Sequence, residues 1–190
     1  MDAFESLVVT LLEREGFWVR SSFKVELTGA EKRRINRPSS PRWELDLVAY
    51  RGSTNEIRII ECKSYLFSRG VSTRAFTAGE RFATRFKLFN DTALYHVVRT
   101  RLVRQLVASG ACRPRPRVSL GLAAGRITSS PERLALHRLF RRKRWLLLDD
   151  DWLRAGLVGA ARGGYENDVA SVVAKLLAKG GLLQVGDEPL

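Results

Sequence analysis

The sequence predicts an α/β protein in which a mixed central β-sheet is flanked by helices. Three observations lead to this prediction. Apolar residues recur at helical spacing near the start of the chain, three apolar segments of strand length follow, and helical and strand-like segments then alternate to the end. A chain of 190 residues can bury a sizeable core as one unit, so we expect residues 1–190 to form a single domain.

The first part of the chain predicts a helix and three strands. Residues 3–15 carry the helical pattern, and Gly16 is typical of the residue that ends a helix. Residues 17–27 are expected to form a strand, and the Pro-, Ser- and Arg-rich residues 28–42 an exposed loop. Residues 43–65 read as two strands joined by a turn at residues 52–55, which predicts an antiparallel hairpin.

The second part predicts helices between two further strands. Residues 74–108 are expected to be largely helical with a break near Asn90, and residues 117–127 to form a buried strand. Residues 130–145 begin with Ser-Pro-Glu, which favours a helix start. A short strand and a turn are expected within residues 145–157, and a closing helix within residues 165–181.

The charge of the chain indicates a polyanionic partner. Thirty-three Lys and Arg residues against 20 Asp and Glu residues give a net charge of +13. Nucleic acid is the commonest such partner for a basic domain, although an anionic membrane surface or a ribosome-like assembly would fit the same charge. The apolar runs are too short to span a bilayer, and the first residues do not resemble a secretory signal, so we expect a cytoplasmic protein.

The cysteines and histidines do not predict a zinc site. The chain has two of each, with no paired spacing, and small buried side chains explain the cysteines better than a Cys/His nucleophile does. The run Asp149–Asp151 is interpreted as a helix N-cap cluster rather than a second metal site.

The hairpin carries the residues that suggest chemistry. Alternation places Ile57, Ile59, Glu61 and Lys63 on one face of the second strand, so a face that begins apolar ends in a carboxylate and an ammonium group. In the first strand, alternation places Trp43, Leu45, Leu47 and Ala49 on one face and puts Asp46 on the other, within an otherwise apolar strand. The hairpin is expected to bring Asp46, Glu61 and Lys63 together at one edge of the sheet.

A third carboxylate belongs to the first helix. Glu5 lies one helical turn before Val8 and Val9 and therefore faces partly into the packed side. Such a position is unfavourable unless something pairs the charge. A divalent cation held by clustered carboxylates would do so, and Mg²⁺ prefers oxygen ligands.

These residues resemble the PD-(D/E)xK nuclease superfamily, which has the restriction-endonuclease-like fold, and look most like its Holliday-junction-resolvase and Mrr-type branches. The resemblance rests on Glu5 and on the segments GFWVR, ELDLVAY and IECKS, and covers residues 3–68. Leu45 stands where the family pattern has Pro, Glu44 is an alternative ligand, and the helical Gln of some branches is absent.

The resemblance implies metal-assisted hydrolysis of DNA phosphodiester bonds. Asp46, Glu61 and Glu5 would hold Mg²⁺, with Mn²⁺ as a substitute, and Lys63 would orient or help deprotonate the attacking water. It also implies a homodimer, because family members often cut two strands as pairs. Branched or foreign DNA is the substrate suggested by this analogy. A basic nucleic-acid-binding protein that does not cut, and an RNA nuclease, are the alternatives.

Two basic segments are open to two interpretations. The basic residues of the predicted loop either form a solvated surface or contact phosphates near the site; they are Lys32, Arg33, Arg34, Arg37 and Arg42. Arg81 and Arg85 are further candidates for contact with nucleic acid. The basic run Arg141–Arg144 is equally compatible with a helix end and with nucleic-acid contact, whereas Trp145 is expected in the core.

Overall fold

A five-stranded mixed sheet forms the centre of the protein. In this computed structural model, residues 2–39, 42–77, 80–164 and 167–184 are described. The strands lie in chain order, with the first three antiparallel and the last two parallel to the third, and their bounds are β1 Trp18–Val25, β2 Trp43–Arg51, β3 Glu56–Lys63, β4 Arg117–Ala124 and β5 Leu146–Leu148. The predicted α/β class with a mixed sheet and flanking helices is therefore confirmed.

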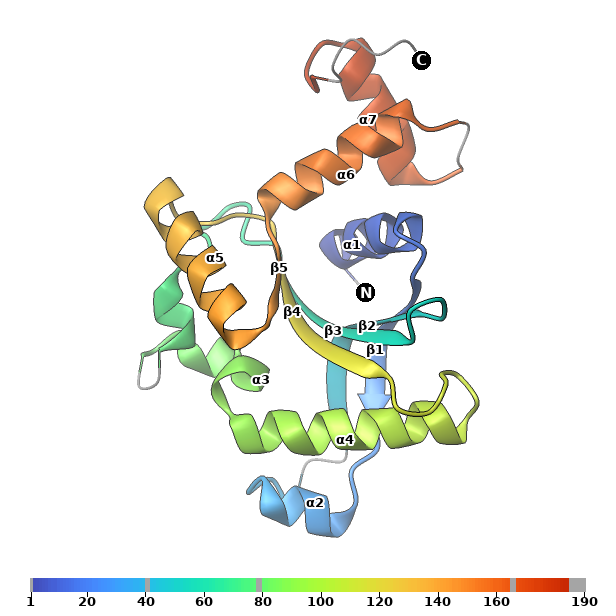
Figure 1. The fold of residues 1–190 in the computed structure, drawn as a ribbon. Coiled ribbons are helices and arrows are strands. Elements are labelled where there is room, and N and C mark those ends of the chain that lie inside the picture. The colour runs from blue at the N-terminus through green and yellow to red at the C-terminus, as the bar shows by residue number, and fades with distance from the viewer. Residues whose placement is uncertain (1, 40–41, 78–79, 165–166, 185–190) are drawn as a thin grey trace.

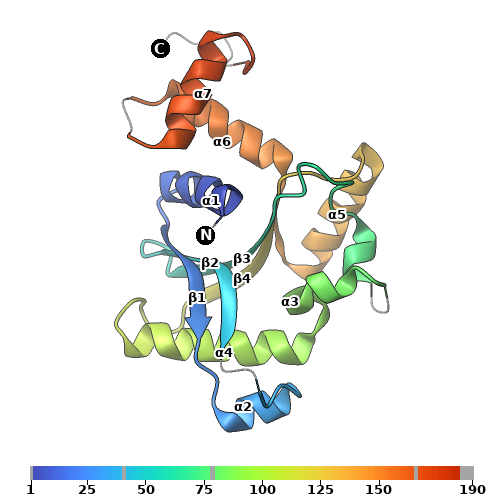
Figure 2. The same cartoon turned by 180° about the vertical axis from the view of Figure 1, so that it is seen from behind.

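Helices cover both faces of the sheet (Figures 1 and 2). On one face lie α1 (Ala3–Arg14) and α6 (Asp150–Arg162), and α7 (Val169–Lys179) packs on α6. On the other face lie α3 (Lys87–Asn90), α4 (Thr92–Ala108) and α5 (Ser130–Lys143). Within the described residues, no helix is both long and apolar enough to cross a membrane.

The core consists of two main clusters, one on each face of the sheet. The first cluster joins the sheet to α3, α4 and α5, and includes Ile57, Ile59 and Phe86. The second cluster joins the sheet to α1 and α6, and includes Ile60 and Cys62. The two sets of β3 residues alternate as predicted, since residues 57 and 59 face one way and residues 60 and 62 the other.

The predicted hairpin is confirmed, but the alternation predicted for its first strand is wrong. Leu45 packs in the first cluster, whereas Leu47 packs in the second, so residues 43–49 do not share one face. The faces change at Asp46. In the neighbouring strand, Ser22 has a φ of 49°, a left-handed conformation, and the pairing of β1 with β2 skips this residue between Ser21–Leu47 and Phe23–Leu45.

Three further expectations need correction. Residues 28–42 are not only a loop, because a Thr28–Glu31 capping box starts α2 (Gly29–Arg34). Residues 74–108 are less helical than expected: two short 3₁₀ turns, η1 (Thr73–Phe76) and η2 (Ala83–Arg85), precede α3 and α4, although the break near Asn90 is confirmed. The turn expected after β5 is the helix α6.

Candidate active site

Asp46, Glu61 and Lys63 meet where β2 and β3 separate. The pairing of the two strands ends at Leu47 opposite Ile60. One position further, Asp46 Oδ2 accepts a hydrogen bond from the backbone N–H of Cys62 at 2.8 Å. Lys63 Nζ lies 2.9 Å from Glu61 Oε1 and 3.8 Å from Asp46 Oδ2. The lysine thus lies between the two carboxylates, as the hairpin predicted.

Strand β4 holds the end of β3 in place. Lys63 is in parallel register with Ala124, and the N–H of Gly125 donates to the carbonyl of Lys63 at 3.0 Å. A Cβ on Gly125 would lie 2.3 Å from the carbonyl oxygen of Ser64 and 3.1 Å from the ring of Phe4. Only glycine allows β4, the end of β3 and the start of α1 to approach this closely.

Burial and mutual charge set the electrostatics of the three groups. The side chains of Glu61, Lys63 and Asp46 are 18%, 20% and 31% exposed. Burial raises the pKa of Glu61, Lys63 opposes this shift, and the nearby charge of Asp46 adds to it. Burial alone would lower the pKa of Lys63, but the charge and hydrogen bond of Glu61, with the charge of Asp46, raise it overall. Lys63 is therefore an ammonium ion at neutral pH.

Glu5 lies at the first turn of α1, within electrostatic reach of this group. It forms a capping box with Asp2: its backbone N–H donates to the Asp2 side chain at 2.7 Å, and its carboxylate accepts from the Asp2 N–H at 3.3 Å. Burial and the charge of Asp2 raise the pKa of Glu5, and Asp46 contributes to the shift. Capping explains why an acid stands at this position, so the charge of Glu5 does not by itself require a cation.

The carboxylate oxygens of Asp46 and Glu61 meet only part of what a divalent cation needs from its protein ligands. Among the described residues, no group of three or more His, Cys, Asp and Glu side chains is arranged to hold a metal ion. Asp46 and Glu61 nevertheless supply carboxylate oxygens from neighbouring strands, and the charge of Asp46 raises the pKa of Glu61. Mg²⁺ binds through one or two protein carboxylates and retains several waters, so a pair of acids suits it.

Most of the predicted basic residues lie around α2, which is packed beside α4. Arg101 of α4 holds this segment, because its Nε donates to the carbonyl of Glu26 at 2.7 Å and lies 3.8 Å from Glu31 Oε2. Lys32, Arg33 and Arg34 form the last turn of α2, Arg37 lies over the Trp43 ring, and Arg42 pairs with Glu26 at 3.5 Å. These contacts tie the segment to α4 and to the start of β2.

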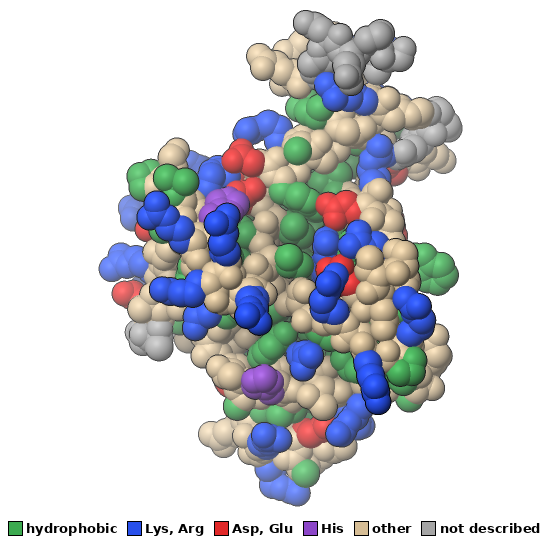
Figure 3. All heavy atoms as spheres, viewed as in Figure 1, with side chains coloured by type: hydrophobic (Ala, Val, Ile, Leu, Met, Phe, Trp, Pro, Cys, Tyr) green, Lys and Arg blue, Asp and Glu red, His purple; other side chains and the backbone are tan. Residues whose placement is uncertain are grey.

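Of the two other basic candidates, one lies beside the site. Arg81 and Arg85 are both exposed, and Arg85 lines a cavity that also contains Phe86. Across the face of the molecule seen in Figure 3, Lys and Arg side chains are widely spread, with fewer Asp and Glu side chains between them. On this face, the positive charge predicted from composition is spread over many elements.

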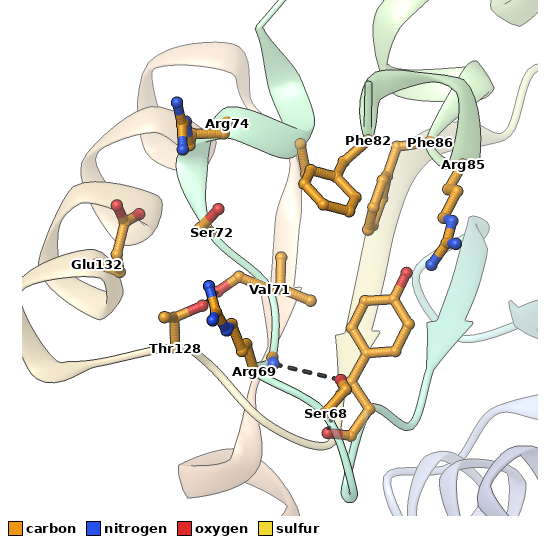
Figure 4. A pocket seen from close by; sticks show the side chains of 13 residues that line it. Ser68, Arg69, Val71, Ser72, Arg74, Phe82, Arg85, Phe86, Thr128 and Glu132 are labelled. Atoms are coloured by element: carbon orange, nitrogen blue, oxygen red, sulfur yellow. Dashed lines mark hydrogen bonds between the residues drawn. The ribbon is translucent and has the colours of Figure 1, made fainter. Parts of the chain in front are cut away.

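The sequence reasoning missed the aromatic residues next to the lysine. Lys63 Nζ lies 5.9 Å from the centre of the Phe86 ring, a cation–π distance. Tyr65 has a φ of 43° and contributes to the shift in the pKa of Lys63. Both residues line the cavity, which has a volume of about 510 Å³ (Figure 4). For Tyr65, the mix of aromatic and basic residues in YLFSR, residues 65–69, was the available signal.

The cysteines and the Asp run are as expected. Cys62 and Cys112 are both buried, and burial raises the pKa of both thiols, so neither is an activated nucleophile. Asp149 caps α6, since its Oδ1 accepts from the N–H of Trp152 at 3.1 Å. Arg133 pairs with all three acids of the run, at 2.8–3.0 Å.

No protein-family model matches this chain, and neither the curated proteins nor the solved structures contain a match to it.

Proposed function

We propose that the protein is a Mg²⁺-dependent deoxyribonuclease with a restriction-endonuclease-like fold. The observation that carries this proposal is the position of Lys63 between Asp46 and Glu61 at the fork of β2 and β3. The net charge of +13 supports a nucleic-acid substrate. The resemblance to PD-(D/E)xK nucleases supplies the reaction class: hydrolysis of a phosphodiester bond.

In this proposal, Asp46 and Glu61 hold the cation and Glu5 completes its surroundings directly or through water. A bound divalent cation lowers the pKa of a coordinated water and neutralises charge on the phosphate. Lys63 acts as a fixed positive charge that stabilises the negative charge developing on the phosphate oxygens. Its raised pKa favours this role over that of a general base. Two copies of the chain would be needed to cut both strands of a duplex in one encounter, which is the basis for expecting a homodimer.

A DNA-binding protein that does not cut is the competing function. One observation favours it: Lys63 already pairs with both carboxylates, and a lysine in this position partly neutralises the charge that would attract a cation. In that case the surface charge binds phosphates, and the acids and the lysine serve as a partly buried ion-pair network.

The test is a cleavage and binding comparison of the parent protein, Lys63→Ala and a control, Lys179→Ala, which removes an exposed lysine on α7. Supercoiled, linear and single-stranded DNA and RNA are incubated with Mg²⁺, Mn²⁺ or EDTA. We expect metal-dependent cleavage of DNA, a loss of roughly 10²–10³-fold in rate for Lys63→Ala, and no loss for Lys179→Ala.

Binding measured in EDTA separates the two functions. Retained DNA binding by Lys63→Ala, together with lost cleavage, supports the nuclease. Binding without cleavage of any DNA by the parent protein supports the non-cutting alternative, and cleavage of RNA alone identifies an RNA nuclease.

A further inference from the structure

The cavity beside Lys63 has walls of two chemical kinds. Tyr65, Phe82 and Phe86 provide aromatic surface, and Arg69, Arg74 and Arg85 provide positive charge. Figure 4 shows Phe82 and Phe86 along one side, with Arg74 and Arg69 on the other. The volume of about 510 Å³ is in the range of sites that enclose small ligands.

The cavity is already formed without a ligand. Phe86 is 1% exposed and packs against Phe76, with ring centres 5.1 Å apart. On the opposite wall, Val71 is tied to the segment after β4, because its N–H donates to the carbonyl of Arg126 at 2.9 Å. Gly70 has a φ of 89°, and a Cβ there would lie 2.8 Å from the same Arg126 oxygen. Binding therefore requires little reorganisation of these walls.

Phe82 is an exposed aromatic residue of the wall. Half of its surface is exposed, whereas Phe86 beside it is buried. An aromatic ring at the mouth of a basic cavity offers a flat surface for stacking, and each stacked base contributes about 1–3 kcal/mol in proteins that bind single strands.

The charge of the cavity selects an anionic ligand. Glu132 is the one acid in its described lining, and its carboxylate already accepts a hydrogen bond from the Thr73 N–H at 2.8 Å. Arg74 pairs with Glu80 at 3.7 Å. Arg69 and Arg85 form no ion pair with any residue of the described part of the chain. A ligand with an aromatic ring and a phosphate can stack on the aromatic side chains and pair with the arginines of the cavity. A nucleotide has both groups.

We propose that this cavity takes one unpaired nucleotide of the DNA strand, next to the phosphate that Lys63 contacts. The proposal rests on the proposed nuclease function and specifies its substrate. A base inside an intact duplex is stacked and paired on both sides and cannot enter a cavity without leaving the helix. Phe86 lines the cavity and also lies next to Lys63, so the unpaired nucleotide is adjacent to the phosphate that is cut. The preferred substrate therefore carries a gap, a flap or a single-stranded end at the cleavage point.

The test uses binding in EDTA, so that it does not depend on cleavage. The probes are a duplex with a single-stranded extension that carries 2-aminopurine, a fully paired duplex of the same length, and the RNA form of the extended probe. The variants are Phe82→Ala, Phe82→Leu, which keeps apolar volume without a ring, and the control Trp18→Ala. Trp18 is an 85% exposed aromatic residue in β1, paired with Tyr50 at the hairpin-turn end of β2.

We expect Phe82→Ala to weaken binding of the extended DNA roughly 5- to 150-fold, the equivalent of about 1–3 kcal/mol. Phe82→Leu should weaken it as well, while Trp18→Ala and the fully paired probe remain unaffected. The 2-aminopurine fluorescence should be quenched by the parent protein and not by Phe82→Ala. Thermal melting of each variant confirms that it is folded.

The two proposals fail in different ways. Equal binding of the extended DNA by the parent protein and both folded Phe82 variants overturns the nucleotide cavity, even if the protein cleaves DNA. Preference for the RNA probe overturns the assignment to DNA. Binding that depends on Phe82, without cleavage of any substrate, supports the cavity and overturns the nuclease.

Discussion

Replacing Asp46 tests whether its carboxylate has a structural role as well as the proposed chemical one. Asp46 Oδ2 accepts the hydrogen bond of the Cys62 N–H, so Asp46→Ala leaves this N–H without its partner. Losing the partner of a backbone donor costs about 1–3 kcal/mol. The Asp46 side chain is 31% exposed, and water can replace part of the bond, so we expect about 1–2 kcal/mol for Asp46→Ala. For a chain of this size the melting temperature falls by about 2–4 °C per kcal/mol.

The matched variant is Asp46→Asn, which keeps an acceptor oxygen for the Cys62 N–H but removes the charge. We expect it to be more stable than Asp46→Ala and equally defective in Mg²⁺-dependent cleavage. Urea denaturation at pH 7 measures the first difference, and nicking of supercoiled plasmid measures the second. Equal stability of the two variants would show that the hydrogen bond contributes nothing. Cleavage by Asp46→Asn at the parent rate would refute the proposed role of the carboxylate.

Three further predictions concern Gly125 and Arg85, near the site, and Glu56, at the opposite end of β3. Gly125→Ala should destabilise the protein by about 1–3 kcal/mol and slow cleavage, because the new Cβ collides with the Ser64 carbonyl at the end of β3; unchanged urea denaturation would contradict this. Burial favours the neutral form of Glu56, but hydrogen bonds and charge from Arg58 and Arg117 lower its pKa below the ordinary value of 4.5. Its ion pairs should therefore stabilise the protein above pH 4.5 and be lost on acidification, so that Glu56→Gln lowers the urea midpoint at pH 7 more than at pH 3. Arg85→Ala should reduce the dependence of log Kd for DNA on log salt by about one, measured by fluorescence anisotropy between 50 and 200 mM salt.

The convergence of Asp46, Glu61 and Lys63 was predictable because a hairpin fixes its own register. The turn at residues 52–55 places Leu47 opposite Ile60 and thus brings position 46 next to position 61. Alternation along β3 then puts Glu61 and Lys63 on one face. Both rules depend only on residues that are close in the sequence, so they can be applied without the structure.

Other features depended on signals that were present but not used. The Thr-x-x-Glu pattern at Thr28 and Glu31 is a capping box and indicated α2 within the basic segment. The Asp149 cap, interpreted as a helix start, required a helix after it, and α6 is that helix. The two 3₁₀ turns, η1 and η2, had no such signal. They are held by the Asn90 side chain, which donates to the carbonyls of Ala75 and Ala83, and contacts of this kind become visible only in the folded chain.

The change of face at Asp46 explains how its charge can act on groups on both faces of the sheet. In a continuous hairpin ladder, a carbonyl of β2 would accept from the N–H groups near Cys62, and residue 46 would point toward one face only. Instead β2 leaves β3 after Leu47, and the Asp46 carboxylate takes the place of the missing backbone acceptor. In that position it lies near Lys63 and affects the pKa of Glu61 on one side and of Glu5 on the other. The fork of the two strands therefore lets one acid act on Glu61 and Lys63, which follow one face of β3, and on Glu5 of α1, which covers the other face.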